Sequence, residues 1–510
     1  MRRVNAKLNK FNLTHSHGTT ADMGWLFPVA SIFTMPGDIF RISNEFLVEF
    51  LALIAPPRHV YTVSLHWWYA PLRIVWKDFP DFLTGGPKGD NASVWPYIMA
   101  PEGGFKPGSL ANRLRCPVNG SNYKVSALPF RIYNMIWNEF YRSEVLQDPV
   151  DVSLESGEDT VTNVELLRRG WQHDYFTDGA PSVSKGPQVT LPLGTTAPVV
   201  GDGNVVTMST SKGQSNLSLV TKDGYDNKTF VGLQGVRGPN FGEYGVTFGD
   251  SSGLVADLSH ASAVTINSLR YASAVWQFQE LNMENGNRYA EFIPSHYGVF
   301  CPDASLQRPQ YLGGSTAPVT VGKVLQTSAS TADSPQGNMA GTASSAGMSP
   351  EIRFMAREHG YLMCLMSIRP ETTYFQGVPR DLSYETRYDL PLPLFAHLGQ
   401  QEIKNKEIYV QGNEDDDKPF AYTNRYDECR SIPNIITGQL VSTLDYWTSA
   451  RKFAELPKLN GEFIEARPDD RIFAVKDTVE NSDHLVVQVL HHISALRPLP
   501  KRGTPGMKVI

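Results

Sequence analysis

The chain has 510 residues and a formal net charge of −6, and charged residues make up 19% of it, below the roughly 25% usual for soluble domains. This acidic balance argues against a dedicated nucleic-acid-binding protein, which would usually be basic, but it leaves room for a basic patch on one face. The cysteines lack C-x-x-C spacing, which excludes a disulfide scaffold and predicts unpaired core thiols in a reducing compartment: Cys116, Cys301, Cys364 and Cys429.

The first segment of the chain is basic, because no acidic residue precedes Asp22 and four basic residues do: Arg2, Arg3, Lys7 and Lys10. This pattern predicts either a solvated tail or an arm that neutralises phosphates. No apolar core follows the charges, so the segment is not a signal peptide. The most apolar run, from Phe46 to Ala55, is too short to span a bilayer, and we expect no membrane insertion.

A β-strand is predicted from Tyr61 to Tyr69, where residue types alternate with a period of two. One side is apolar and is expected to be the single buried face, with Thr62, Ser64 and His66 on the other. Pro71 ends the strand, since proline has no N–H to donate. We predict structural or interface roles for the aromatic residues in and after this strand: Trp67, Trp68, Tyr69, Trp76, Phe79 and Phe82.

Two helices and two more strands are predicted further along the chain. Apolar residues recur at three and four positions from Ile132 to Phe140 and again from Ile266 to Trp276, and the second helix should end near Gly286. Tyr361 to Ile368 is an apolar strand. Leu485 to Ile493 is predicted to be a strand buried on both faces.

Residues 194–260 have a different composition, dominated by Gly, Ser, Thr and Asn, with short pieces that favour β structure. We interpret this stretch as a variable insertion on the rim of the fold. The whole chain, 1–510, is expected to form a single domain that contains this insertion.

No enzyme motif has the context that it needs. Gly249 to Gly253 fits G-x-S-x-G, but its flanks are rich in Gly and Ser and do not predict a strand and a helix, and His260 is near only in sequence. The acidic turn from Glu414 to Asp417 is either a solvated loop or a cation site, and the loop is preferred. We therefore predict no catalytic, cofactor-binding or metal-binding residues.

Several motifs together resemble one family. They are R-x-x-W and F-x-x-G-G after the first strand, R-x-Y-x-x-I-W-N-E at Arg131, and D-Y-F-T at Asp174. From Arg288 to Thr327 follow R-Y-x-E, S-H-Y-G-V, P-D, Q-R-P-x-Y-L-G-G and V-x-Q-T, and E-H-G stands at Glu358. This set resembles the major capsid proteins of the Microviridae, in particular their gokushovirus-like branch. The family more often has Phe-Val-Pro where this chain has Tyr69-Ala70-Pro71.

The resemblance implies a mainly β fold, an eight-stranded antiparallel jelly roll of the viral capsid type with long loops and a few short helices. It implies pentamers and a T=1 icosahedral shell around circular single-stranded DNA, assembled in the bacterial cytoplasm and found in the virion. It also implies several partners, namely a small basic DNA-binding protein, an internal scaffolding protein, a DNA pilot protein and a host surface receptor. The insertion at 194–260 would form surface protrusions that contribute to host attachment.

Basic residues near the two ends are the candidate DNA contacts, since they neutralise backbone phosphates without reading the bases: Arg2, Arg3, Lys7, Lys10, Arg497, Lys501 and Arg502. The competing interpretation is that both ends are solvated or bind neighbouring subunits. The alternative function is a β-rich hydrolase or carbohydrate-binding protein. That function would need paired carboxylates or a triad in a cleft, and the sequence offers no convincing set.

Overall fold

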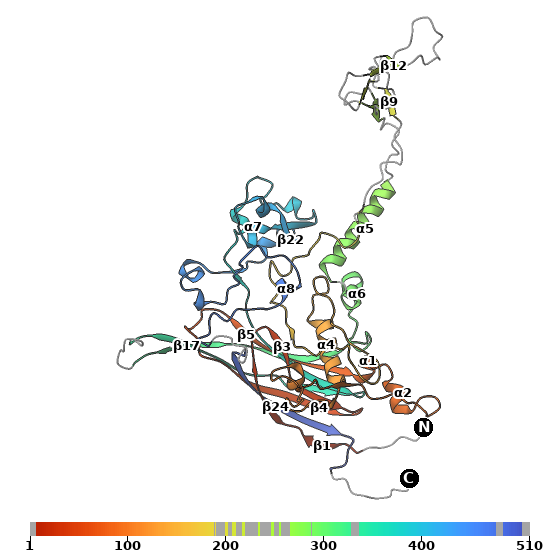
Figure 1. Cartoon of the computed structure of the whole chain (residues 1–510), viewed down its shortest axis with the longest axis vertical. Helices are drawn as coiled ribbons and strands as arrows, with labels where there is room; N and C mark the ends of the chain where they lie inside the picture. The colour runs from red at the N-terminus through yellow and green to blue at the C-terminus, as the bar shows by residue number, and fades with distance from the viewer. Residues whose placement is uncertain are drawn as a thin grey trace. The chain divides into compact units, whose positions relative to one another are not determined.

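The computed structural model describes residues 7–187, 189, 266–286, 288–327, 336–475 and 483–501, together with six short strands between Val199 and Ala256. The chain forms two compact units (Figure 1). The larger unit combines Met1–Val183 with Leu281–Ile510, and the smaller unit is Ser184–Glu280. The smaller unit therefore contains the predicted insertion at 194–260 and extends beyond it on both sides.

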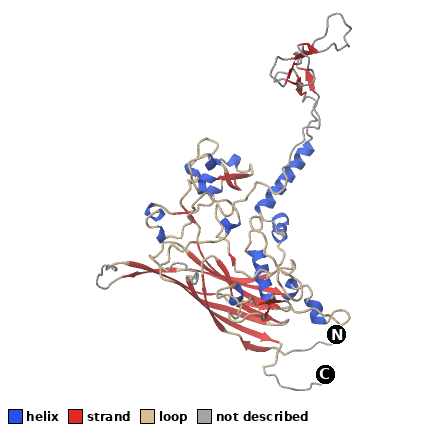
Figure 2. Cartoon of the chain, viewed as in Figure 1, coloured by secondary structure: helices blue, strands red, loops and turns tan. Residues whose placement is uncertain are grey.

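A seven-stranded antiparallel sheet forms one layer of the larger unit (Figure 2). Its strands are β1 (Asn9–Asn12), β2 (His15–Ala21), β4 (Ile39–Phe50), β16 (Thr320–Leu325), β17 (Met339–Met348), β18 (Ile352–Met355) and β24 (Leu485–Arg497). β24 is central, because it pairs with β4 on one side and with both β1 and β2 on the other. The last long strand of the chain thus joins the first strands to the rest of the sheet.

A five-stranded antiparallel sheet forms the second layer, in the order β15-β5-β19-β3-β8. Its strands are β3 (Trp25–Thr34), β5 (Tyr61–Pro71), β8 (Leu167–Arg168), β15 (Gln310–Pro318) and β19 (Gly360–Pro370). β5 and β19 confirm the two strands predicted at 61–69 and 361–368. β5 ends at Pro71, as expected.

The two sheets share one apolar core. Trp67 and Val63 of β5 contribute to it from one layer, and Val48 of β4 and Val487 of β24 contribute from the other. All four side chains are buried, and each belongs to the alternating inward set of its strand. The larger unit is therefore a mainly β sandwich of antiparallel sheets, which confirms the predicted mainly β, antiparallel fold class.

A second core covers the outer face of the five-stranded sheet. It is built around α4 (Leu128–Phe140), with the short helices α1 (Leu72–Val75), α2 (Phe79–Thr84) and α3 (Leu110–Arg113) beside it. Trp68 and Ala70 of β5 belong to this core and are buried. The prediction that this strand has a single buried face was therefore wrong for its second half, where helices cover the face that would otherwise be exposed.

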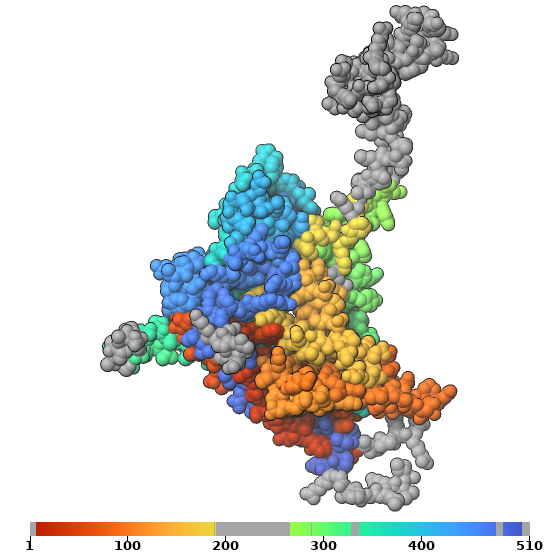
Figure 3. All heavy atoms as spheres, in the orientation of Figure 1, coloured from red at the N-terminus to blue at the C-terminus, as the bar shows by residue number. Residues whose placement is uncertain are grey.

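A third core is built mainly from the segment between β19 and β24, together with Tyr175 and Phe176 from earlier in the chain. It packs the strand pair β21 (Gln400–Lys404) and β22 (Pro419–Asn424) with α7 (Asn405–Ile408) and α8 (Gly461–Ile464). In the space-filling view these segments, coloured cyan to blue, gather in one lobe (Figure 3). Smaller paired strands complete the unit: β6 (Tyr97–Met99) with β7 (Lys124–Ser126), and β20 (Thr373–Tyr374) with β23 (Asn434–Ile435).

The smaller unit contains two sets of short antiparallel strands. β10 (Thr207–Thr210), β11 (Leu217–Leu219), β12 (Leu233–Gln234) and β13 (Val246–Phe248) form one sheet, and β9 (Val199–Gly201) pairs with β14 (Leu254–Ala256). The helix α5 (Ile266–Glu284) crosses the boundary of the two units in sequence and confirms the predicted helix. α6 (Tyr289–Tyr297) follows it. Among the described helices, none is long and apolar enough to cross a membrane.

Two sequence expectations about burial were wrong. β24 alternates between buried and exposed residues instead of being buried on both faces, and Val486 is 45% exposed. The reason is that β24 has the sandwich core on one side only. The cysteines are all unpaired, as predicted, but they are not all core thiols, because Cys364 is buried while Cys429 is exposed.

Candidate assembly and genome-contact sites

The aromatic residues predicted as structural or interface groups lie mostly inside the chain. Trp67 packs in the core between the sheets, while Trp68, Trp76 and Phe79 belong to the second core. Tyr69 is also buried, and its hydroxyl donates a hydrogen bond to the backbone oxygen of Glu358 at 2.9 Å. These side chains hold the sheet to its neighbours and are not free to contact a second copy.

Phe82 differs from the other five because it is 39% exposed. Its ring centroid lies 4.9 Å from that of Trp76, so one side of the ring is packed against the second core. Trp76 itself is fixed by its indole N–H, which donates to Ser156 Oγ at 2.8 Å. Of this aromatic set, Phe82 is the residue with surface left for an intermolecular contact.

Two strands from opposite ends of the sequence bring the described members of the two predicted basic clusters to one sheet. β1 pairs antiparallel with β24, so that Lys10 faces Leu496 and Asn9 faces Arg497. Lys7, Lys10 and Lys501 are exposed. Arg2, Arg3 and Arg502 lie outside the described residues. Among the described residues, the pairing of β1 with β24 therefore places basic residues from both ends of the chain near one another.

Arg497 is already engaged within the subunit. Its side chain forms an ion pair with the fully buried Asp38 at 3.3 Å and donates to the backbone oxygen of Phe33 at 2.8 Å. Its guanidinium also lies 5.5 Å from the ring centroid of Phe40. Because these contacts hold the Arg497 guanidinium inside the subunit, we do not propose Arg497 as a DNA contact.

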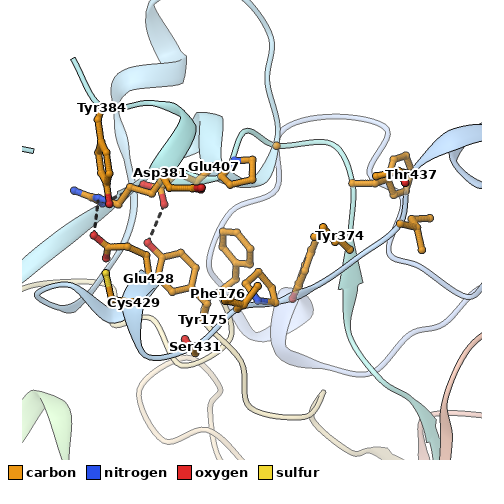
Figure 4. Close-up of a pocket in the computed structure, with 18 residues that line it drawn as sticks. Tyr175, Phe176, Tyr374, Asp381, Tyr384, Glu407, Glu428, Cys429, Ser431 and Thr437 are labelled. Carbon is orange, nitrogen blue, oxygen red and sulfur yellow. Dashed lines mark hydrogen bonds and ion pairs between the residues drawn. The ribbon is translucent and has the colours of Figure 1, made fainter. Parts of the chain in front are cut away.

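A cavity of about 480 Å³ lies in the third core and is lined mainly by aromatic and aliphatic side chains (Figure 4). Two carboxylates stand at one end with Arg380 between them. Its guanidinium lies 3.2 Å from a Glu407 oxygen and 3.7 Å from a Glu428 oxygen. Tyr175 donates to the other oxygen of Glu407 at 2.8 Å.

This paired-carboxylate arrangement does not suit acid–base catalysis. Burial raises the pKa of Glu407, as a general acid would need, but both its oxygens are already occupied. The Glu407 oxygen that faces Arg380 also accepts the backbone N–H of Lys404 at 3.0 Å, and the Gln401 side-chain amide donates to a Glu428 oxygen at 2.6 Å. Cys429 and Ser431 line the cavity without a histidine among its lining residues. The cluster is a structural ion-pair network.

The acidic turn at 414–417 is stabilised by hydrogen bonds and ion pairs with neighbouring segments. The acidic turn is a short 3-10 helix, η4 (Glu414–Asp417), and Asp416 accepts the backbone N–H groups of Gln411 and Gly412. Asp417 is paired with Lys404 and Lys406. No cluster of three metal-ligating side chains occurs in the part of the chain that the structure describes. The G-x-S-x-G stretch at 249–253 and His260 lie outside the described residues.

The sequence reasoning missed one polar site, on the outer face of the five-stranded sheet. A cavity of about 430 Å³ there brings together Arg169, Arg369, His66, Tyr141 and Tyr311. We call these five residues the arginine pocket. His66 was already on the polar side of its predicted strand, but no local pattern joins it to two arginines from distant segments.

The comparisons with known proteins agree with one another. A family model described as "Capsid protein (F protein)" matches residues 1–507. A capsid protein VP1 of Bdellovibrio phage phiMH2K is 33% identical over 99% of this chain and 96% of its own length. The capsid proteins VP1 of Chlamydia phage 1 and Spiroplasma virus 4 are 32% and 30% identical, each over 98% of this chain and 96% of the relative.

Proposed function

This chain belongs to the capsid protein (F protein) family of the Microviridae, and from that membership we propose that it assembles into a T=1 icosahedral shell around circular single-stranded DNA. The observation that carries the proposal is the match along nearly the whole chain to structural proteins of the virion. The chain is a capsid protein and not an enzyme. No specific observation favours the hydrolase or carbohydrate-binding alternative.

We further propose that the sandwich is an eight-stranded jelly roll. β1 with β2, and β17 with β18, each occupy a single position beside one partner strand. When each of these pairs is counted as one strand, the eight strands in chain order are β1/β2, β3, β4, β5, β15, β17/β18, β19 and β24. One sheet then has the order first, eighth, third, sixth, and the other has the order second, seventh, fourth, fifth. This interleaved order supports two Greek keys. β16 and β8 are then additional edge strands.

Two long connections leave this proposed jelly roll. One runs from Leu72 to the start of β15 and includes most of the second core and the smaller unit. The other runs from Glu371 to β24 and supplies most of the third core. Loops of this length in a single subunit are usually functional. We propose that they make the contacts between copies in the shell, and that residues 194–260 contribute to host attachment.

The direct test is assembly of the purified chain, produced with and without the internal scaffolding protein that we expect to assist it. Electron microscopy should show uniform small shells, or pentamers as their precursors. Analytical ultracentrifugation provides the second measurement. A well-folded monomer that persists at high concentration with its scaffold present would contradict the proposal.

A further inference from the structure

Two arginines in the arginine pocket stand close together without a compensating carboxylate. Arg169 follows β8 at one edge of the five-stranded sheet, and Arg369 is near the end of β19. Arg169 donates to Ser367 Oγ at 2.7 Å, and Arg369 donates to the backbone oxygen of Gly170. Among the described residues, no aspartate or glutamate forms an ion pair with either guanidinium.

The remaining lining of the pocket does not neutralise this charge. The Tyr141 ring lies 5.5 Å from the Arg169 guanidinium, and its hydroxyl is 2.7 Å from His66 Nδ1. Tyr311 closes another side and is 48% exposed. His173 is paired with Asp178 on its own loop. Two positive charges therefore share a half-buried cavity whose other lining groups, apart from the His173–Asp178 pair, are rings, hydroxyls and the Gln172 amide.

The electrostatics of the pocket reflect this crowding. Burial and the Arg169 charge lower the pKa of Arg369 to about 9, and burial also lowers the pKa of Arg169. Burial, followed by both arginines, lowers the pKa of His66 to about 4. At neutral pH both guanidiniums are thus charged while the imidazole is neutral. Like charges at short range in a partly desolvated site repel, and an anion placed between them removes that repulsion.

We infer that the arginine pocket receives an aspartate or glutamate side chain from a second copy of this chain. The inference rests on the proposed shell, in which every subunit has identical copies beside it. The chain carries 52 acidic against 46 basic side chains, so its surface has carboxylates to offer. A carboxylate bound between two guanidiniums makes charge-assisted hydrogen bonds that neither subunit can form alone.

The surroundings favour a single carboxylate over a nucleic acid. A strand of DNA needs a continuous positive groove that follows its phosphates. The neighbouring cavity contains Arg142 and Arg288, but these are already paired with Glu144 at 3.9 Å and Glu291 at 3.0 Å. No lysine lines the arginine pocket among the described residues. The uncompensated charge is therefore confined to one point.

The test compares Arg169→Gln, Arg369→Gln and the double variant with the wild-type chain. We expect the double variant to reduce the assembled fraction at a fixed concentration at least tenfold, as measured by ultracentrifugation and electron microscopy. The matched control is Arg353→Gln, since Arg353 is exposed and paired with Glu351 on its own subunit. This control should assemble normally. The double Arg-to-Lys variant keeps both charges and should recover part of the assembly.

A second measurement separates an intermolecular role from a structural one. Because the glutamines remove like-charge repulsion, unassembled subunits of the double variant should melt at the wild-type temperature or above it. A variant that unfolds, or whose melting temperature falls, would assign the arginines to holding the subunit together and would overturn the inference.

The remaining outcomes are also decisive. Normal assembly of the double variant, in shells as resistant to salt as the wild type, contradicts the inference but leaves the proposed shell intact. If the wild-type chain does not assemble at all, the proposed function itself has failed. A fluorescent oligothymidylate that binds wild-type subunits and not the variant, while both assemble equally, would show a nucleic-acid site instead.

Discussion

At the scale of single residues, Arg131 and Asp159 show how burial changes the contribution of an ion pair to the stability of the fold. Their side chains are 1% and 0% exposed, and Arg131 Nε lies 2.7 Å from Asp159 Oδ2. Burial alone would raise the pKa of Asp159, but hydrogen bonds from Thr162 and Arg131 outweigh it and lower the pKa. Arg131 also donates to the backbone oxygens of Val75 and Glu155, so the pair ties α4 to the segments around it.

Replacing Asp159 with Ala should lower the free energy of unfolding by about 3–5 kcal/mol, because it leaves a buried guanidinium without its counter-ion. Chemical denaturation of unassembled subunits measures this change. The matched control is Lys77→Ala, which breaks an exposed pair with Glu155 and should leave the free energy of unfolding almost unchanged, because solvent screens that pair. Equal effects of the two substitutions would contradict the argument from burial.

A buried histidine predicts acid sensitivity. His491 is fully buried in the sandwich, hydrogen-bonded to Asn44 at 2.7 Å, and burial together with the nearby His15 lowers its pKa to about 4. A lowered pKa stabilises the fold above the unfolded value near 6.5, and this contribution falls as the pH drops toward 4. His491→Gln should remove about 2 kcal/mol of the loss of stability between pH 6.5 and 5, measured by denaturation at both values. An unchanged pH profile would show that other groups cause the sensitivity.

At the scale of elements, the insertion at 194–260 can be separated from the cores. The residues that form the three cores all come from the larger unit. Replacing residues 194–260 with a short Gly/Ser linker should therefore leave shell formation intact and reduce adsorption to the host. Particle counts and adsorption rates are the two measurements. If the deletion abolishes folding, the stretch belongs to the core and the proposal for it is wrong.

Elements with a strong local pattern could be predicted from the sequence, and sites formed by distant segments could not. β5, β19 and α4 follow from alternation or from a three-to-four spacing that a short window contains. The arginine pocket could not be foreseen, since Arg169 and Arg369 meet only through the sheet order. The error on β24 has the same origin, because a run of apolar residues does not tell how many of its faces are covered.

At the scale of the whole molecule, the paired ends of the chain form the surface that we propose for the genome. Lys7, Lys10 and Lys501 are exposed beside the pairing of β1 with β24, and Arg2, Arg3 and Arg502 are the further candidates. The net charge of −6 limits what the subunit can neutralise alone, so we expect a small basic partner to supply most of the compensation.

Replacing Arg2, Arg3, Lys7 and Lys10 with Ser should lower the DNA content of the shells and weaken the salt dependence of DNA retention, because each lost phosphate contact reduces the salt slope by about one unit. Nuclease-resistant DNA per particle, measured across a range of salt concentrations, provides the readout. Lys323→Ser, on β16, is a control of the same chemistry away from the ends. Shells with normal DNA content and unchanged salt sensitivity would assign the ends to solvent or to neighbouring subunits.

The central place of β24 also affects the synthesis of the protein. Leu485 to Arg497 separate β4 from β1 and β2, so the seven-stranded sheet is incomplete until the ribosome has passed Arg497. Pairings across such a long stretch of sequence form slowly, and β4 keeps an unpaired edge until they do. A product of premature termination therefore lacks the strand that completes the sheet. We expect proteases to degrade such fragments and the shell to take up full-length copies instead.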